Sequence, residues 1–246
     1  MLAFSGKTAL ITGGAKRIGR AITVALAAAG ANAVIHYRSS ADEAEATAEC
    51  VRALGPKAWT VPADLADPTD TATLFDRATD AAGPIDLLVN NAAIFEPSTL
   101  TDFRTDDLLR NMQVNALAPH QLARAFVAQR RDGAIVNFLD TRVVDYDRGH
   151  VAYHLSKRML LSLTRMMALE FAPNVRVNAV APGLILPPPG KDESYLERLA
   201  TSNPLNRVGS LSQVTDTVLF LLGNEFVTGQ VVFVDGGQHM NGRMYE

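Results

Sequence analysis

One stretch decides the fold: Thr12-Gly13-Gly14-Ala15-Lys16-Arg17-Ile18-Gly19, which lies between an apolar run at Lys7–Thr12 and an alanine-rich run at Arg17–Ala29. The first run predicts a strand, and the second predicts a helix that ends at Gly30. The glycines between them allow a tight turn, and backbone N–H groups at the start of a helix can face a phosphate group. The stretch therefore predicts a strand–turn–helix unit that can hold a pyrophosphate.

The same alternation of short apolar runs and longer helical stretches continues along the chain. Further strands are predicted at Asn32–Tyr37, Lys57–Val61, Ile85–Asn90, Gly133–Leu139, Val175–Val180 and Gln230–Val234. Further helices are predicted at Ala41–Leu54, from Asp67-Pro68 onward, from Thr105 to about Arg130, at Val151–Phe171, near Glu193–Ala200 and at Ser212–Leu222. This order implies a doubly wound parallel sheet with helices on both faces. We therefore expect one α/β domain over residues 1–246.

The composition excludes several classes of function. The chain has 246 residues, 48% of them hydrophobic and 20% charged, which is an ordinary globular balance. A net charge of −3 gives no basic excess to attract nucleic acid or anionic lipid. No apolar run reaches the roughly 18 residues of a membrane span, and the N-terminus lacks the pattern of a signal peptide. The single cysteine favours a reducing compartment, so we expect a cytoplasmic protein.

The end of the second strand indicates which dinucleotide the turn would bind. The strand runs into His36-Tyr37-Arg38-Ser39, where an arginine and a hydroxyl can bind a ribose 2′-phosphate. Enzymes that use NAD often carry an acidic residue at this point, for the free 2′-hydroxyl. Arg38 is otherwise an arginine at an exposed strand end. With the glycine-rich turn upstream, we expect phosphate recognition and a strong preference for NADPH.

Two further segments fall where nucleotides bind in such sheets, at the carboxyl ends of strands. Ala63-Asp64-Leu65 follows the third strand, and Asn90-Asn91-Ala92-Ala93 follows the fourth. Asp64 can accept a hydrogen bond from an adenine amino group, and the small side chains of Ala92 and Ala93 let the backbone approach a ribose. Ordinary turn chemistry is the alternative explanation for both segments.

Tyr153 and Lys157 form the candidate proton-transfer pair. They lie four residues apart in Tyr153-His154-Leu155-Ser156-Lys157, so they share one face of a predicted helix. A free tyrosine has a pKa of about 10. The lysine charge and an oxidised nicotinamide both favour the tyrosinate, so they should lower the pKa of Tyr153. An ionised carboxylate of Asp140 beside the phenol would oppose its deprotonation. Together with the glycine-rich turn, the pair predicts hydride transfer between a nicotinamide and a small substrate.

As a set, these residues resemble the short-chain dehydrogenase/reductase family over almost the whole chain. The match extends to Asn115, Pro182-Gly183 and Asp235-Gly236-Gly237. The resemblance implies a single Rossmann-like domain with a seven-stranded parallel sheet, assembled as a homotetramer through its long helices. The family's catalytic group is Asn, Ser, Tyr and Lys, and the serine is missing here. Asp140 fits its position, and the neighbouring Thr141 could supply a hydroxyl.

Asp140 and Arg17 both depart from the general family, and the chain then resembles its pteridine reductase and dihydromonapterin reductase branch. That branch carries an arginine in the glycine-rich turn and an aspartate in place of the serine. Phe95 matches the aromatic residue on which that branch stacks the pterin ring, although alone it would be taken for a core or loop aromatic. The resemblance implies that a pterin, dihydropterin or dihydrofolate ring is reduced. NADPH would deliver a hydride to a C=N carbon, and Asp140 with Tyr153 would protonate the adjacent nitrogen.

The expected site is as follows. The expected catalytic residues are Asn115, Asp140, Tyr153 and Lys157, and the expected substrate residues are Arg17, Phe95, Asp140 and Tyr153. The expected cofactor residues are Gly13, Arg17, Ile18, His36, Tyr37, Arg38, Ser39, Asp64, Leu65, Asn91, Ala92, Ala93, Tyr153, Lys157, Pro182 and Gly183. A loop at about 184–200, stiffened by Pro187-Pro188-Pro189, is expected to close over the substrate.

Two other functions remain open. One is an NADPH-dependent carbonyl reductase of the same family, acting on a 3-oxoacyl thioester or a sugar ketone, against which Asp140 argues. The other is a catalytically idle relative that binds NADPH as a sensor or scaffold, against which the intact Tyr153 and Lys157 pair argues. No cluster of His, Cys and carboxylate residues has the spacing of metal ligands, so no metal is expected. We expect His150 to lie in a loop and His154 on the surface of a helix.

Overall fold

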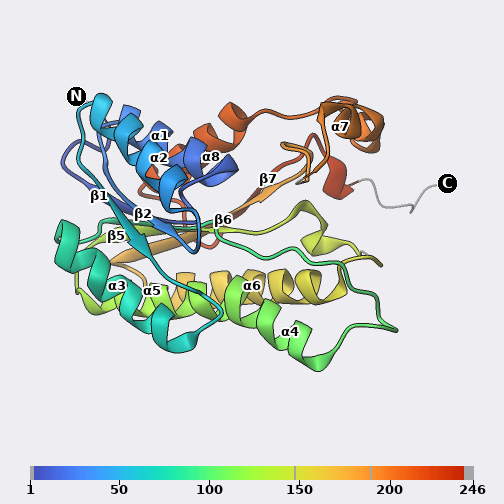
Figure 1. Ribbon diagram of the computed structural model, residues 1–246, viewed down its shortest axis with the longest axis horizontal. Coiled ribbons are helices and arrows are strands. Elements are labelled where there is room, and N and C mark those ends of the chain that lie inside the picture. Colours follow the sequence, from blue (N-terminus) through green and yellow to red (C-terminus); the bar gives the residue numbers. More distant parts are fainter. Residues whose placement is uncertain (1–2, 147, 189, 241–246) are drawn as a thin grey trace.

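The computed structural model describes residues 3–146, 148–188 and 190–240 and contains one seven-stranded parallel sheet (Figure 1). The order across the sheet is β3-β2-β1-β4-β5-β6-β7. The strands are β1 (Thr8–Thr12), β2 (Asn32–Tyr37), β3 (Ala58–Pro62), β4 (Leu87–Asn90), β5 (Gly133–Phe138), β6 (Val175–Pro182) and β7 (Val231–Val234). The order reverses direction at β1, which lies beside β2 and β4, so this is a doubly wound Rossmann fold as expected.

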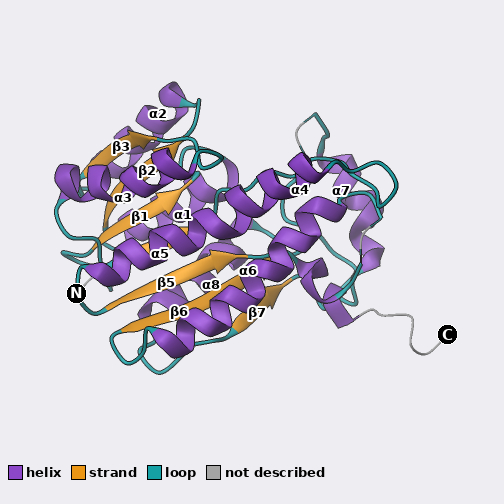
Figure 2. Ribbon diagram, turned by 90° about the horizontal axis from the view of Figure 1, so that it is seen from below, coloured by secondary structure: helices purple, strands orange, loops and turns teal. Residues whose placement is uncertain are grey.

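Helices cover both faces of the sheet (Figure 1). On one face lie α1 (Arg17–Ala28), α2 (Ala41–Ala53) and α8 (Leu211–Gly223). On the other face lie α3 (Pro68–Ala82), α5 (Ala118–Ala128) and α6 (Val151–Glu170). The remaining helices, α4 (Thr105–Met112) and α7 (Glu193–Leu199), lie at the end of the molecule toward which β5, β6 and β7 point (Figure 2).

The alternation of side chains along each strand explains the two cores. In β1, Leu10 packs with Leu74 and Leu122 on the side of α3 and α5, whereas Ile11 packs with Ile22 on the side of α1. Successive side chains of a strand point to opposite faces, and each face here is covered by helices. The strands therefore consist almost entirely of apolar residues.

The predicted start of α3 is confirmed in detail. Asp67 caps the helix, and its carboxylate accepts hydrogen bonds from the backbone N–H groups of Thr69 at 2.7 Å and Asp70 at 3.4 Å. Pro68 occupies the first turn, where its missing N–H costs nothing because that group would have no partner within the helix. Together, the capping aspartate and the proline fix the residue at which α3 begins after β3.

The helix predicted from Thr105 to about Arg130 is not one regular α-helix. It consists of α4, a π-helical segment at Gln113–Leu117, and α5. Pro119 lies in the first turn of α5 and has no N–H to donate to the carbonyl of Asn115, four residues earlier. At this break the N–H of Ala118 bonds to the carbonyl of Gln113, five residues back. The irregularity therefore falls at Asn115, one of the expected catalytic residues.

The loop that follows β6 lies beyond the carboxyl ends of the strands. The backbone N–H of Gly209 donates to the carbonyl of Leu184 at 2.9 Å, and this bond joins the two ends of the segment between them. Of the three expected prolines in the loop, Pro189 lies outside the described residues. Within the described ranges, no helix is long and apolar enough to cross a membrane, and no group of three or more potential metal ligands occurs.

Candidate active site

The glycine-rich turn packs so closely that side chains are excluded at two positions. Gly13 has a φ of +62°, in the left-handed region, and a Cβ there would lie 3.2 Å from the Cα of Ala92. A Cβ on Gly19 would lie 2.0 Å from the carbonyl oxygen of Gly13. Only glycine avoids these contacts, so the first turn of α1 can fold back tightly onto the end of β1.

The segment after β4 is hydrogen-bonded directly to this turn. The Thr12 hydroxyl accepts from the backbone N–H groups of Asn91 at 3.0 Å and Ala92 at 3.1 Å. The Asn91 amide donates in return to the carbonyl of Thr12 at 3.0 Å and to that of Gly13 at 3.2 Å. Two segments predicted separately from the sequence, and 79 residues apart, therefore form one rigid edge of the site.

His36 holds the third part of this edge in place. Its Nδ1 accepts from the backbone N–H of Gly13 at 3.1 Å, and its Nε2 lies 3.1 Å from the carbonyl of Ala63. These partners require the neutral ring with its proton on Nε2. Burial lowers the pKa of His36 from 6.5 to about 4, although the bond to Ala63 and nearby carboxylates act in the other direction. His36 is therefore a neutral link between the ends of β1, β2 and β3.

This link predicts a loss of stability in mild acid. Because the pKa of His36 is about 4 in the folded chain and 6.5 when unfolded, only the unfolded chain binds the proton between these values. The neutral His36 contributes about 3 kcal/mol to the unfolding free energy. This contribution is complete above pH 6.5 and is lost as the pH falls from 6.5 through about 4. We expect the stability difference between wild type and His36→Asn, measured by urea unfolding, to shrink steadily over that range. A difference independent of pH would contradict this role.

A cavity of about 380 Å³ lies against this edge. Most of the expected cofactor residues line it: Gly13, Arg17, Ile18, His36, Arg38, Asp64, Leu65, Asn91, Ala92 and Ala93. The other expected cofactor residues do not line it: Tyr37, Ser39, Tyr153, Lys157, Pro182 and Gly183. Tyr37 and Ser39 lie at and just after the end of β2, Tyr153 and Lys157 lie on α6, and Pro182 and Gly183 lie where β6 ends. Lys16 also lines the cavity, and the sequence analysis did not select it. Its position next to Arg17 is the feature of the sequence that could have indicated Lys16 as a cofactor residue.

The candidate proton-transfer group lies at the end of β5 and the start of α6. The Tyr153 hydroxyl donates to a carboxylate oxygen of Asp140 at 3.2 Å. Lys157 is buried one turn further along α6, and its Nζ donates to the carbonyl of Phe138 at 2.6 Å. That nitrogen lies 5.7 Å from the centre of the Tyr153 ring. The spacing of the pair on one helix therefore places them together, and β5 brings Asp140 to the phenol.

In the protein without cofactor the pKa of Tyr153 is not lowered, and the opposing effect expected of Asp140 is present. Burial, and then the charge and hydrogen bond of Asp140, raise the pKa of Tyr153 well above 10.0. Burial also lowers the pKa of Lys157 from 10.5 to about 8, with Asp140 opposing that change. The lysine contacts a backbone carbonyl rather than the phenol oxygen, so Asp140 dominates the electrostatics of the hydroxyl. Tyr153 is therefore protonated at neutral pH.

Asn115 connects the break between α4 and α5 to two other parts of the site. Its side chain accepts from the N–H of Ile94 at 2.9 Å and donates to the carbonyl of Ile94 at 3.0 Å. It also donates to the Ser156 hydroxyl at 3.0 Å, on α6. Ser156, which the sequence analysis did not select, thus ties Asn115 to the helix that carries Tyr153. The expected catalytic role of Asn115 remains a prediction.

Two of the expected substrate residues lie at the mouth of the site. The Phe95 side chain is 48% exposed, and its ring meets the ring of Tyr153 edge-on with 4.7 Å between centres. Arg17 has a φ of +54°, and its guanidinium donates to the carbonyl of Pro187 at 2.6 Å. The glycine-rich turn is therefore bonded to the loop after β6, which the sequence pattern could not indicate.

A family model described as enoyl-(acyl carrier protein) reductase matches residues 13–239. An uncharacterised oxidoreductase from Mycobacterium tuberculosis is 37% identical over 253 residues, covering 96% of this chain and 94% of that protein. L-xylulose reductase from Bos taurus is 36% identical over 251 residues, covering 96% and 98%. Alternative dihydrofolate reductase 1 from Brucella canis, in a crystal structure with NADP, superposes with a TM-score of 0.89 at 38% identity, covering 98% of this chain and 96% of that one. The chain belongs to the short-chain dehydrogenase/reductase family.

The chain is accordingly an NAD(P)-dependent oxidoreductase of the short-chain family. Thr141 does not take the place of the family's serine in this structure. Its hydroxyl is buried and donates to the carboxylate of Asp235, at the end of β7. Asp140 is therefore the only one of these two neighbours whose side chain bonds to Tyr153.

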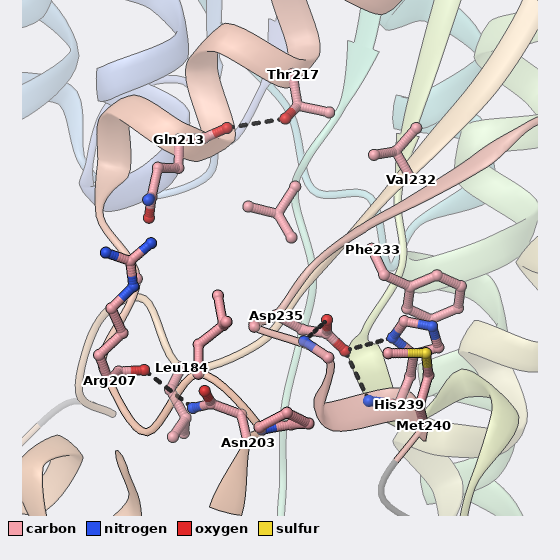
Figure 3. Close-up of a pocket in the computed structure, with 16 residues that line it drawn as sticks. Leu184, Asn203, Arg207, Gln213, Thr217, Val232, Phe233, Asp235, His239 and Met240 are labelled. Carbon is pink, nitrogen blue, oxygen red and sulfur yellow. Dashed lines mark hydrogen bonds and ion pairs between the residues drawn. The ribbon is translucent and has the colours of Figure 1, made fainter. Parts of the chain in front are cut away.

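Asp235 organises a second, larger cavity of about 600 Å³ (Figure 3). Its carboxylate accepts from the backbone N–H groups of Gly237 at 2.9 Å and His239 at 2.8 Å, and it lies 2.9 Å from the His239 ring. Burial pushes the pKa of Asp235 upward, but the bonds from Thr141, His239 and Gly237 outweigh it, so that pKa is lowered. Neither Tyr153 nor Asp140 lines this cavity. Asp235 instead anchors Thr141, and with it the end of β5 that carries Asp140.

The expectation that His154 lies on the surface of its helix is wrong. The side chain is 5% exposed, and its ring meets the Tyr153 ring edge-on with 5.2 Å between centres. α6 packs against β6 on one side and against α4 on another. Side chains on more than one face of this helix are therefore buried. A helix that contacts a second helix as well as the sheet does not follow a simple one-sided pattern.

Proposed function

We propose that this protein is an NADPH-dependent reductase of a pterin-like ring, with dihydropterins and dihydrofolate as the candidate substrates. The observation that carries the proposal is the hydrogen bond from the Tyr153 hydroxyl to Asp140. An ordinary ketone offers only a carbonyl oxygen, which a carboxylate repels. A pterin ring offers N–H groups that a carboxylate accepts, next to a nitrogen that must gain a proton.

The protonation state of Tyr153 favours reduction over oxidation. A dehydrogenase needs a tyrosinate that removes a proton from an alcohol, which requires a lowered pKa. Here burial and Asp140 raise the pKa of Tyr153, so the phenol stays protonated at neutral pH. A protonated phenol next to the substrate is a proton donor, which is what ring reduction requires.

The residues of the smaller cavity fit NADPH. Lys16, Arg17 and Arg38 surround it with positive charge, and Arg38 at the end of β2 supports binding of a 2′-phosphate. Asp64 also lines the cavity, and its carboxylate can accept from an adenine amino group. The buried Lys157 lies beside Tyr153, in reach of a nicotinamide ribose.

The substrate ring is proposed to lie against Phe95, with Asp140 and Tyr153 at its reacting edge. Bound NADPH supplies a hydride to the carbon of a C=N bond and is oxidised to NADP. Tyr153 donates the proton that the adjacent nitrogen gains, so the double bond becomes a C–N single bond with an N–H. Asp140, which is half-buried, returns a proton from solvent to the phenol. Arg17 and the loop after β6 are proposed to close the site, which is supported by the bond between Arg17 and Pro187.

The relatives support two candidate functions. The structural neighbour from Brucella canis carries the description of an alternative dihydrofolate reductase, which supports ring reduction. L-xylulose reductase is similarly close in identity, which supports the alternative of a carbonyl reductase. We also propose a homotetramer that assembles through the long helices, because Leu109 on α4 and Met166 and Leu169 on α6 are exposed by 57%, 63% and 83%.

The proposal is tested by following NADPH oxidation with dihydropterins, oxidised pterins, dihydrofolate and simple ketones, each repeated with NADH. We expect turnover on pterin rings and at least about a tenfold higher kcat/KM with NADPH than with NADH. Turnover on ketones alone would establish the carbonyl reductase instead. NADPH binding without turnover on any compound would leave a catalytically idle protein, and equal efficiency with NADH would contradict the role of Arg38.

A further inference from the structure

His150 and Phe95 form an aromatic stack at the mouth of the site. Their ring centres are 3.9 Å apart, and the planes differ by 13°. Phe95 also meets Tyr153 edge-on, with 85° between the ring planes. One face of Phe95 is therefore covered by His150, and its edge is fixed against the proposed proton donor. Phe95 nevertheless remains 48% exposed, so a ligand can contact it.

The segment that carries Phe95 is also held at both ends. At one end, the Asn115 side chain bonds to the backbone of Ile94, at 2.9 and 3.0 Å. At the other, Ser98 pairs with His150 in a short parallel β-bridge. The buried Ser98 hydroxyl accepts from the N–H of Ala152 at 3.1 Å. Residues 94–98 are therefore bonded at both ends, to Asn115 and to the start of α6.

We propose that His150 is a positioning residue, which fixes the plane of Phe95 so that a flat heteroaromatic ring binds on the opposite face with its reacting edge toward Tyr153. The inference rests on the proposed function, because it concerns the ring that Phe95 would stack. It assigns His150 no contact with substrate or cofactor. Its effect is to hold one rotamer of Phe95 before the substrate arrives, so that binding does not have to order that side chain.

The inference leads to a specific pattern among four variants: His150→Ala, His150→Phe, Phe95→Ala and the double alanine variant. Stacked aromatic pairs contribute about 0.5–1.5 kcal/mol, so loss of the stack should raise the KM for the pterin by about 3- to 10-fold. The KM for NADPH should stay within about twofold, because neither Phe95 nor His150 lines the cofactor cavity. His150→Phe keeps a flat ring at the position and should restore the wild-type KM.

Non-additivity separates positioning from a general structural effect. In the Phe95→Ala background there is no ring left to orient, so adding His150→Ala should change the KM for the pterin by less than about twofold. An unchanged KM for NADPH in every variant shows that the fold is intact. A structural role for His150 would instead raise both KM values, and would do so equally with or without Phe95.

Each outcome decides the matter. If wild type reduces the pterin but His150→Ala equals wild type, or His150→Phe is as impaired as His150→Ala, the positioning role is wrong and the proposed function stands. The same holds if His150→Ala retains its full effect without Phe95. Binding of an oxidised pterin is followed by its fluorescence. If wild type neither binds it nor reduces a dihydropterin, the proposed function is wrong, and so is the positioning role.

Discussion

Replacing Tyr153 with phenylalanine is expected to lower kcat for pterin reduction by about 10²- to 10⁴-fold, the usual contribution of a general acid. The change removes only the hydroxyl that donates to Asp140, while the ring that meets Phe95 edge-on is retained. Substrate and cofactor binding should therefore change little. The measurement is steady-state NADPH oxidation, together with the dissociation constant of NADPH from its fluorescence.

Tyr146→Phe is the matched control for that experiment. Tyr146 is 83% exposed and packs under Arg158, so loss of its hydroxyl tests the same chemical change away from the proton-transfer group. We expect this variant to behave as wild type. If Tyr153→Phe kept more than about a tenth of the wild-type kcat, Tyr153 would not be the proton donor, and another group would have to protonate the ring nitrogen.

Replacing Asp140 with serine, the residue usual in the family, is expected to lower kcat/KM for the pterin by about 10²-fold. The change removes the carboxylate that is proposed to accept from the ring N–H groups and to return a proton to Tyr153. The same change should raise the low activity on simple ketones, because a serine hydroxyl can donate to a carbonyl oxygen. Asp140→Asn is the matched variant that keeps the shape of the side chain and removes its charge.

The pH profile gives a second measure of the same substitution. Asp140 raises the pKa of Tyr153 and opposes the lowering of the pKa of Lys157 to about 8. Without the carboxylate both pKa values fall, so Tyr153 and Lys157 each lose a proton at lower pH than in wild type. The alkaline limb of kcat/KM should move to lower pH in Asp140→Ser and Asp140→Asn alike. Full pterin reduction by Asp140→Ser, with an unmoved profile, would contradict the proposed relay.

Much of the fold and of the cofactor edge was predictable from the sequence because the signals are local. Gly13 and Gly19 are required by the geometry of one turn, and the capping residue Asp67 and Pro68 start α3 as their types indicate. The apolar strands follow from burial on both faces of a parallel sheet. The spacing of Tyr153 and Lys157 is a property of one helix. None of these inferences depends on which distant segment lies nearby.

The remaining features depend on contacts between distant parts of the chain. The pKa of Tyr153 is raised because the fold buries the phenol and because the end of β5 places Asp140 at its hydroxyl. Thr141 is held by Asp235, 94 residues later, and Arg17 contacts Pro187, 170 residues later. His154 is buried because α6 has two packing partners.

By itself, the sequence determined the strand and helix order, the glycine-rich turn and the residue types available for chemistry, since each is encoded within a turn of helix or a few residues of strand. Only the tertiary structure decided the contacts that no pattern indicated: Phe95 with His150, Asn115 with Ile94, and Thr141 with Asp235. The physical reason is that burial and the nearest charge set the protonation and orientation of a side chain. Both are supplied by segments that fold against it from elsewhere in the chain.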